Sequence, residues 1–178
     1  MLAPEIPGFV VTPAARSDAP AWAAFAALPE MNRLVSAPVT SEADLVAMIE
    51  RTLSPEPGAP VQFVVREAGT GQMVASVGFH TVSALNRTAE VTFSVRPERW
   101  GQGLATAVCT AAVRWAFRHR GWVRVQGTAL EENAASQRVL LKSGFEFEGR
   151  LRNFRLVRGE PCDYLLYACV PPKAAGPV

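Results

Sequence analysis

The sequence predicts an α/β domain with a mixed, mostly antiparallel central sheet of about seven strands flanked by four helices. Three observations predict this class. Residues 89–95 alternate apolar and polar side chains, as a strand does, and lead through a glycine-rich turn into a helical pattern. Short strand-like runs separated by turn residues precede this unit and favour an antiparallel meander. Further helical and strand-like runs follow, and the last two form a hairpin.

The first third of the chain predicts a strand followed by two helices. Residues 8–12 are rich in β-forming side chains. Ser17 or Asp18 caps the first helix, which Pro29 ends. Its apolar stripe is either part of the core or a lid over a substrate site, and it consists of Trp22, Phe25 and Leu28.

A loop is expected at residues 30–39, before the second helix. Thr40 or Ser41 is the candidate cap of this helix, because both side chains carry a hydroxyl that accepts from the first helical N–H groups. The predicted buried face consists of Leu45, Met48, Ile49 and Leu53. Both helices therefore precede most of the strands.

The middle of the chain predicts the meander and a crossover. Residues 61–66 and 73–82 form an antiparallel hairpin, and the strand at 89–95 completes the meander. A long helix then runs from about 101 to 119, with a glycine at its end. The strand at 122–129 returns parallel to the 89–95 strand, as a right-handed helical crossover requires.

The last part of the chain predicts one more helix and the final hairpin. Asn133 is a good cap for the helix, and Gly144 is its stop signal. The two strands of the hairpin lie at 147–156 and 163–170, joined by a turn that contains glycine and proline. We expect residues 171–178, which are rich in proline and alanine, to be a disordered tail.

Length and composition limit the classes of function that this protein can have. The 178 residues, 49% of them hydrophobic, suffice for a single domain, which we place at residues 1–170. The net charge of only +2, without a long basic run, indicates neither nucleic acid nor a membrane as partner. No apolar run is long enough to span a bilayer, and the first residues lack the basic region followed by an apolar segment that is typical of a signal peptide, so we expect a cytoplasmic protein. The three cysteines show no C-x-x-C spacing, which predicts reduced thiols and no metal site.

The glycine-rich turn before the long helix is a candidate anion site. Gly101 and Gly103 have no Cβ, so their backbone can approach a ligand closely, while the following helix offers unpaired N–H groups and its positive dipole end. The alternative is a tight turn that binds nothing. No Lys-Ser/Thr follows the glycines and G-x-G-x-x-G is absent, which excludes a P-loop and a dinucleotide fingerprint.

Two stretches resemble the Gcn5-related N-acetyltransferases, which use acetyl-CoA. The run W-G-Q-G-L-A-T at 100–106 resembles their pyrophosphate-binding loop, and ENAASQRVLLKSGFEFEGRLRN at 132–153 resembles a segment of the Rim-type, ribosomal-protein alanine acetyltransferases. The superfamily pattern Gln/Arg-x-x-Gly-x-Gly/Ala is broken at Trp100, where Rim-type members commonly have an aromatic residue. The resemblance covers residues 8–170 and implies the acetyltransferase fold.

The resemblance also implies how acetyl-CoA would be held. A backbone N–H near Val95 would bind the thioester carbonyl, where the next strand splays away. Asn133 would contact the pantetheine arm, cap its helix, or do both. Arg99 or Arg96 would meet the 3′-phosphate, unless they form only a solvated basic turn. The pyrophosphate would lie against the turn and first helical residues, which are Gly101, Gln102, Gly103, Leu104, Ala105 and Thr106.

Two residues are the catalytic candidates. Many superfamily members protonate the thiolate with a Tyr seven residues after the Asn, but Leu140 stands there; Rim-type members use a hydroxyl one turn after the Asn, here Ser136. Ser136 is thus the acid or orienting group, or merely a capping residue.

Strand alternation places Glu90 on a polar face, as a base acting through water or as a surface carboxylate paired across the sheet. Because Cys109 lies in the apolar part of a helix, we favour direct transfer in a ternary complex.

The function expected from the sequence is acetyl transfer from acetyl-CoA to a primary amine. A protein N-terminal α-amine is the leading acceptor, since its pKa of about 8 leaves it partly neutral near neutral pH. The alternatives are a small amine, such as a polyamine, an aminoglycoside or an amino-acid-like toxin, and a sensor that binds acyl-CoA without turnover. A homodimer is a further expectation, by analogy with similar proteins.

Overall fold

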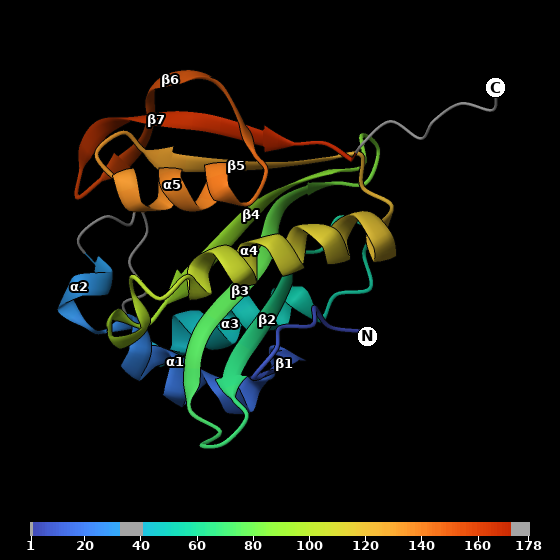
Figure 1. The fold of residues 1–178 in the computed structure, drawn as a ribbon, viewed down its shortest axis with the longest axis vertical. Helices are drawn as coiled ribbons and strands as arrows, with labels where there is room; N and C mark the ends of the chain where they lie inside the picture. Colours follow the sequence, from blue (N-terminus) through green and yellow to red (C-terminus); the bar gives the residue numbers. More distant parts are fainter. Residues whose placement is uncertain (1, 33–40, 172–178) are drawn as a thin grey trace.

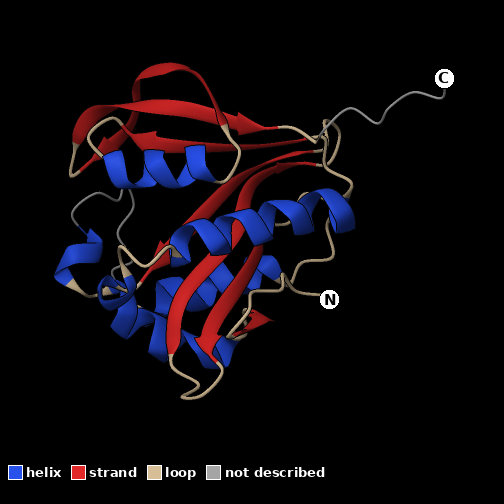
Figure 2. Cartoon of the chain, viewed as in Figure 1, coloured by secondary structure: helices blue, strands red, loops and turns tan. Residues whose placement is uncertain are grey.

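The computed structural model describes residues 2–32 and 41–171 and contains one seven-stranded sheet with helices on both faces (Figures 1 and 2). The strand order is β1-β2-β3-β4-β5-β7-β6, and every neighbouring pair is antiparallel except β4 and β5. The strands are β1 (Phe9–Pro13), β2 (Val61–Glu67), β3 (Met73–Ser83), β4 (Thr88–Val95), β5 (Arg124–Leu130), β6 (Glu146–Val157) and β7 (Glu160–Cys169). This confirms the predicted fold class, including the parallel return and the final hairpin.

Four helices of eight or more residues, together with one short helical turn, make up the helical part of the described chain. They are α1 (Ala19–Ala26), α2 (Pro29–Asn32), α3 (Glu42–Thr52), α4 (Leu104–Trp115) and α5 (Ala134–Lys142), with 3₁₀ turns at Arg16–Asp18 and Pro97–Arg99. A π-helical turn, Ala116–Arg120, extends α4, and Gly121 ends it in the left-handed conformation (φ 62°). None of the helices formed by the described residues is long and apolar enough to cross a membrane.

Several boundaries differ from the sequence prediction; the first helix, which Pro29 was expected to end, stops at Ala26, and Pro29 begins α2. The long helix begins at Leu104 and not at residue 101, because Gly101 and Gly103 have φ of 72° and 80°, which a right-handed helix does not accommodate. Residues 30–32, predicted as loop, belong to the helical turn α2. The rest of that loop, the cap candidate Thr40 and residues 172–178 of the predicted tail lie outside the described residues.

The helices bury two separate cores on the two faces of the sheet (Figure 1). On one face α4 packs against aromatic side chains of the strands, with Phe63 edge-on to Trp115 at 4.9 Å between ring centroids. On the other face Trp22 and Phe25 of α1 are buried with Leu45 and Ile49 of α3. The first helix therefore belongs to the core. Ser41 caps α3 by accepting from the N–H of Asp44 at 3.2 Å.

The only parallel pair of the described sheet is also the shortest of its strand pairings. Pairing between β4 and β5 covers three positions, from Thr88 opposite Arg124 to Glu90 opposite Gln126. Beyond Glu90 the two strands part, while β4 stays paired with β3 as far as Val95. Backbone groups on the β5-facing edge of β4 are thereby released from the sheet, and this is where the candidate site lies.

Candidate active site

The glycine-rich turn lies between the end of β4 and the start of α4. Its two glycines adopt positive φ, and a Cβ placed on either would have no atom within 4 Å, so the turn faces open space. The 12-residue helix behind it starts with N–H groups that have no partner within the helix. All six residues predicted to bind pyrophosphate thus lie together in this turn and the first helical turn, an arrangement suited to an anion.

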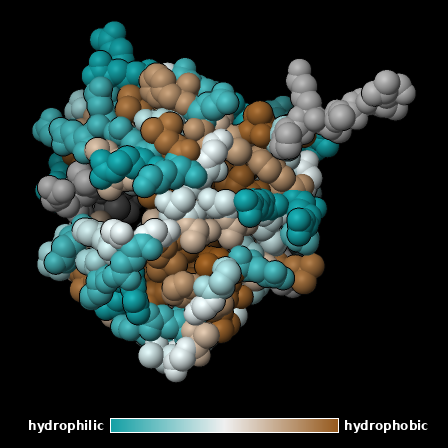
Figure 3. Space-filling view, viewed as in Figure 1, coloured by the Kyte–Doolittle hydropathy of each residue, from teal (hydrophilic) through white to brown (hydrophobic). Residues whose placement is uncertain are grey.

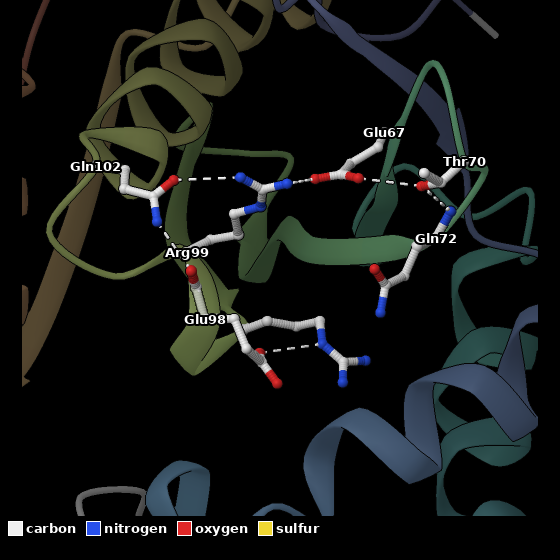
Figure 4. Close-up of polar contacts among 7 residues, drawn as sticks. Glu67, Thr70, Gln72, Glu98, Arg99 and Gln102 are labelled. Atoms are coloured by element: carbon white, nitrogen blue, oxygen red, sulfur yellow. Dashed lines mark hydrogen bonds and ion pairs between the residues drawn. The ribbon is translucent and has the colours of Figure 1, made fainter.

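Arg99 is held in a polar network that links the turn to the β2–β3 hairpin (Figure 4). Its guanidinium pairs with Glu67 and donates to Gln102 Oε1 at 3.3 Å. Thr70 donates to the same Glu67 at 3.0 Å, and Gln102 donates to the backbone oxygen of Glu98 at 2.9 Å. Arg99 is therefore an oriented cation and not an isolated solvated one. Arg96 pairs with Glu98 at 3.3 Å.

The backbone at the end of β4 offers donors to the opening beside it. The N–H of Arg96 donates to Val74 of β3 at 2.9 Å, and successive residues of a strand point their backbone groups to opposite edges. The N–H groups of Val95 and of Phe93, two residues earlier, therefore face the side from which β5 has parted. Val95 was a sequence candidate, whereas Phe93 was missed.

Trp100 folds back onto the same strand end. Its indole N–H donates to the backbone oxygen of Val95 at 2.6 Å, although the side chain is half exposed. The residue that breaks the superfamily pattern thus fastens the glycine-rich turn to the strand that precedes it. No periodicity in the sequence indicates this contact, because it joins two irregular segments.

A cavity of about 110 Å³ passes between β4 and β5 where they part. Ser136 and Leu140 of α5 line it from the α4 side of the sheet, whereas His80, Glu90 and Arg155 line it from the other side. Between them lie residues of the two strands themselves, which are Val91, Thr92, Phe93, Gly127 and Thr128. The cavity therefore has both catalytic candidates, Ser136 and Glu90, in its lining.

Glu90 is buried, with only 4% of its side chain exposed, and it is surrounded by donors. Its Oε1 accepts from the hydroxyl of Thr128 at 2.6 Å and from Arg155 at 2.9 Å, and its Oε2 accepts from Gln126 at 3.3 Å. Glu90 is thus paired across the sheet, but it is buried and is not the surface carboxylate that the sequence analysis gave as the alternative to a base. Arg155, 65 residues away in sequence, carries no local signal that would have revealed this pair.

His80 lies opposite Glu90 on β3 and lines the same cavity. Burial lowers the pKa of His80 below its ordinary 6.5, an effect that Arg155 reinforces and the charge of Glu90 opposes. The imidazole is therefore neutral near pH 7 and able to accept a proton. Sequence analysis did not select His80, because its relation to Glu90 depends on the strand register.

Asn133 and Ser136 begin α5 as the cap prediction requires. Asn133 Oδ1 accepts from the backbone N–H of Ser136 at 3.1 Å. The cap uses the side-chain oxygen of Asn133, so its NH₂ group is the part that faces other partners. Because Asn133 performs the capping, the hydroxyl of Ser136 is not needed for it, and Ser136 lines the cavity.

The cysteine of the long helix is unsuited to nucleophilic chemistry. Cys109 is fully buried, and burial raises the pKa of its thiol to about 12. A thiol with this pKa is protonated at neutral pH and cannot attack a thioester. This supports transfer without an acetyl-cysteine at this position. Within the described residues, no three His, Cys, Asp or Glu side chains gather as metal ligands would.

Comparison with known sequences gives a family for this geometry. Residues 9–146 match the profile described as acetyltransferase (GNAT) domain. The chain is 32% identical over 113 residues to the uncharacterized N-acetyltransferase YoaA of Bacillus subtilis, a match that covers 64% of each protein. It is 32% identical over 76 residues to a ribosomal-protein-alanine N-acetyltransferase of Escherichia coli, covering 42% of this chain and 39% of that one. The chain thus matches less than two thirds of the length of either relative.

Solved structures share the fold over nearly the whole chain. A ribosomal-protein-alanine acetyltransferase from Vibrio fischeri superposes with a TM-score of 0.82 at 17% identity, covering 97% of this chain and 98% of that one. A chimeric form of the spermidine N-acetyltransferase SpeG from Vibrio cholerae reaches 0.81 at 18% identity, covering 92% and 95%. At these identities the likeness concerns the fold alone, and it does not distinguish a protein acceptor from a polyamine.

Proposed function

Because this chain belongs to the acetyltransferase (GNAT) family, we propose that it transfers the acetyl group of acetyl-CoA to a protein N-terminal α-amine. The observation that carries the proposal is the opening between β4 and β5. It connects the face on which the anion-binding turn begins α4 to the face that holds Glu90 and His80. A donor held on the first face and an acceptor on the second would meet at this cavity.

Backbone groups form most of the part of the site that would bind acetyl-CoA. The turn at Gly101–Gly103 and the start of α4 would hold the pyrophosphate, and Arg99, oriented by Glu67, would face the 3′-phosphate. The unpaired N–H groups of Phe93 and Val95 would bind the pantetheine arm and the thioester carbonyl. Such fixed donors stabilise the negative charge that develops on that oxygen during attack.

Proton transfer follows from the side chains of the cavity. The neutral amine attacks the acetyl carbon, a C–N bond forms and the C–S bond breaks. Glu90 or His80 takes the proton released by the amine nitrogen, through water. The hydroxyl of Ser136 orients the sulfur and passes its proton to the departing thiolate while it regains one from water, the role that Leu140 cannot perform.

The charge of the cavity supports an α-amine as acceptor. Glu90 is neutralised by Arg155, and the lowered pKa of His80 keeps that ring uncharged near pH 7. The cavity therefore lacks the excess negative charge that would attract a polycation such as spermidine. An α-amine, with a pKa of about 8, also needs less help to lose its proton than an alkyl ammonium does.

The test is a calorimetric titration with acetyl-CoA followed by a thiol-release assay in the same buffer. Acceptors would be peptides with different N-termini, polyamines and aminoglycosides. Release with peptides alone supports the proposal, and release with a polyamine or aminoglycoside alone replaces it with small-amine acetylation. Binding without release from any acceptor would favour an acyl-CoA sensor, for which the replacement of the usual Tyr by Leu140 is the specific observation.

A further inference from the structure

Arg155 of β6 is a permanent cation in the lining of the cavity. Its side chain is 32% exposed, and it lines the cavity together with His80 and Glu90. Its Nη2 donates to Glu90 Oε1 at 2.9 Å, whereas its Nη1 and Nε have no hydrogen-bond partner among the residues that the structure describes. All three nitrogens of a guanidinium carry N–H donors. Arg155 therefore still has charged donors to offer to a ligand beside Glu90.

Two aromatic rings hold the guanidinium of Arg155 in its place. Its Cζ lies 5.0 Å from the ring centre of Phe154 and 5.6 Å from that of Tyr164. The two rings meet edge-on, with their centres 5.8 Å apart. The negative face of an aromatic ring attracts a cation, so these contacts and the bond to Glu90 restrain the same group. The donors that the chain does not use are thus oriented before a ligand arrives.

Arg155 lies on the face of the sheet where the proposed function places the acceptor. Thr128 of β5 donates to Glu90, so both side chains belong to the face opposite α5. Leu130, two residues further along β5, shares that face, and it pairs with Tyr164 of β7. The guanidinium of Arg155 contacts both Glu90 and the ring of Tyr164. It therefore stands beside the group that would take the proton of the amine.

The charge of Arg155 selects what the acceptor carries next to its amine. In a polypeptide N-terminus, only two carbon atoms separate the reacting nitrogen from the carbonyl oxygen of the first residue, and this oxygen accepts hydrogen bonds from a cation well. A polyamine has further ammonium groups in place of such an oxygen, and a guanidinium repels them. Arg155 therefore favours an α-amino carbonyl compound over an alkyl amine.

We infer that Arg155 determines acceptor specificity, donating from its second nitrogen to the carbonyl oxygen of the first residue of the acceptor. The inference rests on the proposed function and specifies its substrate: the α-amine is recognised together with the peptide carbonyl beside it. Glu90 and His80 serve the reacting nitrogen, whereas Arg155 binds the neighbouring oxygen. Arg155 keeps its charge throughout and takes no part in proton transfer.

A matched pair of acceptors tests the hydrogen bond itself. One is an alanine-terminated peptide, and the other is its thioamide, in which sulfur, a poorer hydrogen-bond acceptor, replaces the first carbonyl oxygen. We expect the wild type to prefer the ordinary peptide about fivefold in kcat/KM. Because this comparison needs no substitution in the protein, it does not depend on how a variant folds.

Arg155→Lys tests whether the guanidinium causes this preference. The variant keeps a positive charge beside Glu90 but loses the planar fork whose separate nitrogens can bind two partners. We expect the KM for the peptide to rise about tenfold, the Kd for acetyl-CoA to stay within about twofold, and the preference over the thioamide to disappear. The control is Arg150→Lys on the same strand, where the pairs with Glu131 and Asp163 lie outside the cavity lining; it should keep all three quantities.

The outcomes separate the inference from the proposed function. Equal kcat/KM for peptide and thioamide in the wild type overturns the inference, while turnover of the peptide leaves the proposed function standing. A wild-type preference that persists in Arg155→Lys, with a lower Tm or kcat, assigns Arg155 to the support of Glu90 alone and also overturns the inference. Wild-type protein that acetylates only polyamines, or no amine at all, overturns both.

Discussion

At the scale of single residues, the candidate site depends on a carboxylate that the sheet buries. Glu90 is tolerable in the interior because Thr128, Gln126 and Arg155 donate to it, which compensates for its lost hydration. The same contacts fix the two oxygens in place beside the cavity. A charge that is held in this way orients neighbouring groups and water without excess negative potential.

A bulky side chain at the glycine-rich turn should abolish acetyl-CoA binding. In Gly103→Val the new side chain meets no protein atom, so it projects into the space where the backbone would approach the pyrophosphate. We expect affinity to fall at least about 100-fold in a calorimetric titration. The strain of a left-handed valine should cost roughly 1–2 kcal/mol of stability.

Gly121→Val is the matched control for this strain. Gly121 borders the other end of the same helix, also has positive φ (62°) and also faces open space. The Gly121→Val variant should lose a similar amount of stability and keep its affinity for acetyl-CoA. Normal binding by Gly103→Val, or equal weakening in both variants, would show that the turn does not hold the donor.

Ser136→Ala should reduce turnover much more than binding. The cap of α5 is made by Asn133, so removing the hydroxyl leaves the helix intact while the cavity loses its proton donor. We expect kcat to fall about 100-fold, with the Kd for acetyl-CoA within about twofold. Steady-state kinetics and calorimetry measure the two quantities, and an unchanged kcat would restrict Ser136 to a structural role.

At the scale of elements, the site is a junction between β4, the glycine-rich turn and α4. The backbone ladder with β5 ends after Glu90, and the turn is fastened in its place by two side-chain contacts. Trp100 ties it to the end of β4, and Arg99 ties it to Glu67 at the end of β2. These contacts keep an irregular, glycine-containing segment in one conformation before a ligand arrives.

Trp100→Phe should weaken acetyl-CoA binding about three- to tenfold without unfolding the protein. The variant keeps an aromatic ring but loses the N–H that reaches Val95, so the turn is free to sample other conformations. Calorimetry gives the affinity, and thermal denaturation confirms that the fold persists. Wild-type affinity in Trp100→Phe would mean that the indole contact does not organise the turn.

The sequence allowed most of the elements to be predicted, because each is signalled by local chemistry. Asn133 and Ser41 cap helices as predicted, and Gly121 and Gly144 adopt the left-handed backbone of helix ends. The partners of the site were not predictable in this way. Arg155 reaches Glu90, and His80 lies opposite Glu90, only through the pairing and register of separate strands.

At the scale of the whole molecule, the sheet separates two chemically different faces. Near the cavity, the α4 side carries apolar side chains, whereas Thr92 and Glu90 on the other side are polar; farther along that side, α1 and α3 bury the second apolar core. Hydrophobic side chains also reach the surface at the upper end of the molecule, where β6, β7 and α5 lie among hydrophilic residues (Figure 3). They include Leu141, Phe147, Phe154 and Leu156. The homodimer expected from the sequence stays a prediction, and this edge is the surface on which to test it.

The stability of the protein should decrease as pH falls below about 6.5, and His80 should contribute to the decrease. Its pKa is lowered in the folded state, so the unfolded chain takes up the proton first, and the stabilisation present above the unfolded pKa is lost below it. Between about pH 7.5 and 5.5 we expect the free energy of unfolding to fall more in the wild type than in His80→Gln. Urea denaturation at the two pH values measures this decrease. An equal decrease in the wild type and in His80→Gln would show that His80 does not contribute to it.

The opening through the sheet also sets the shape of a selective inhibitor. The reactants would approach this cavity from opposite faces of the sheet. A single molecule in which a short two-atom bridge joins CoA to the nitrogen of a peptide would then occupy the acetyl-CoA site and the acceptor site together. Its affinity would draw on the anion-binding turn at one end and on the cavity residues around Glu90 at the other. Such a bisubstrate ligand would also report on the acceptor, because only an amine component that matches the polar face would add to the binding of CoA alone.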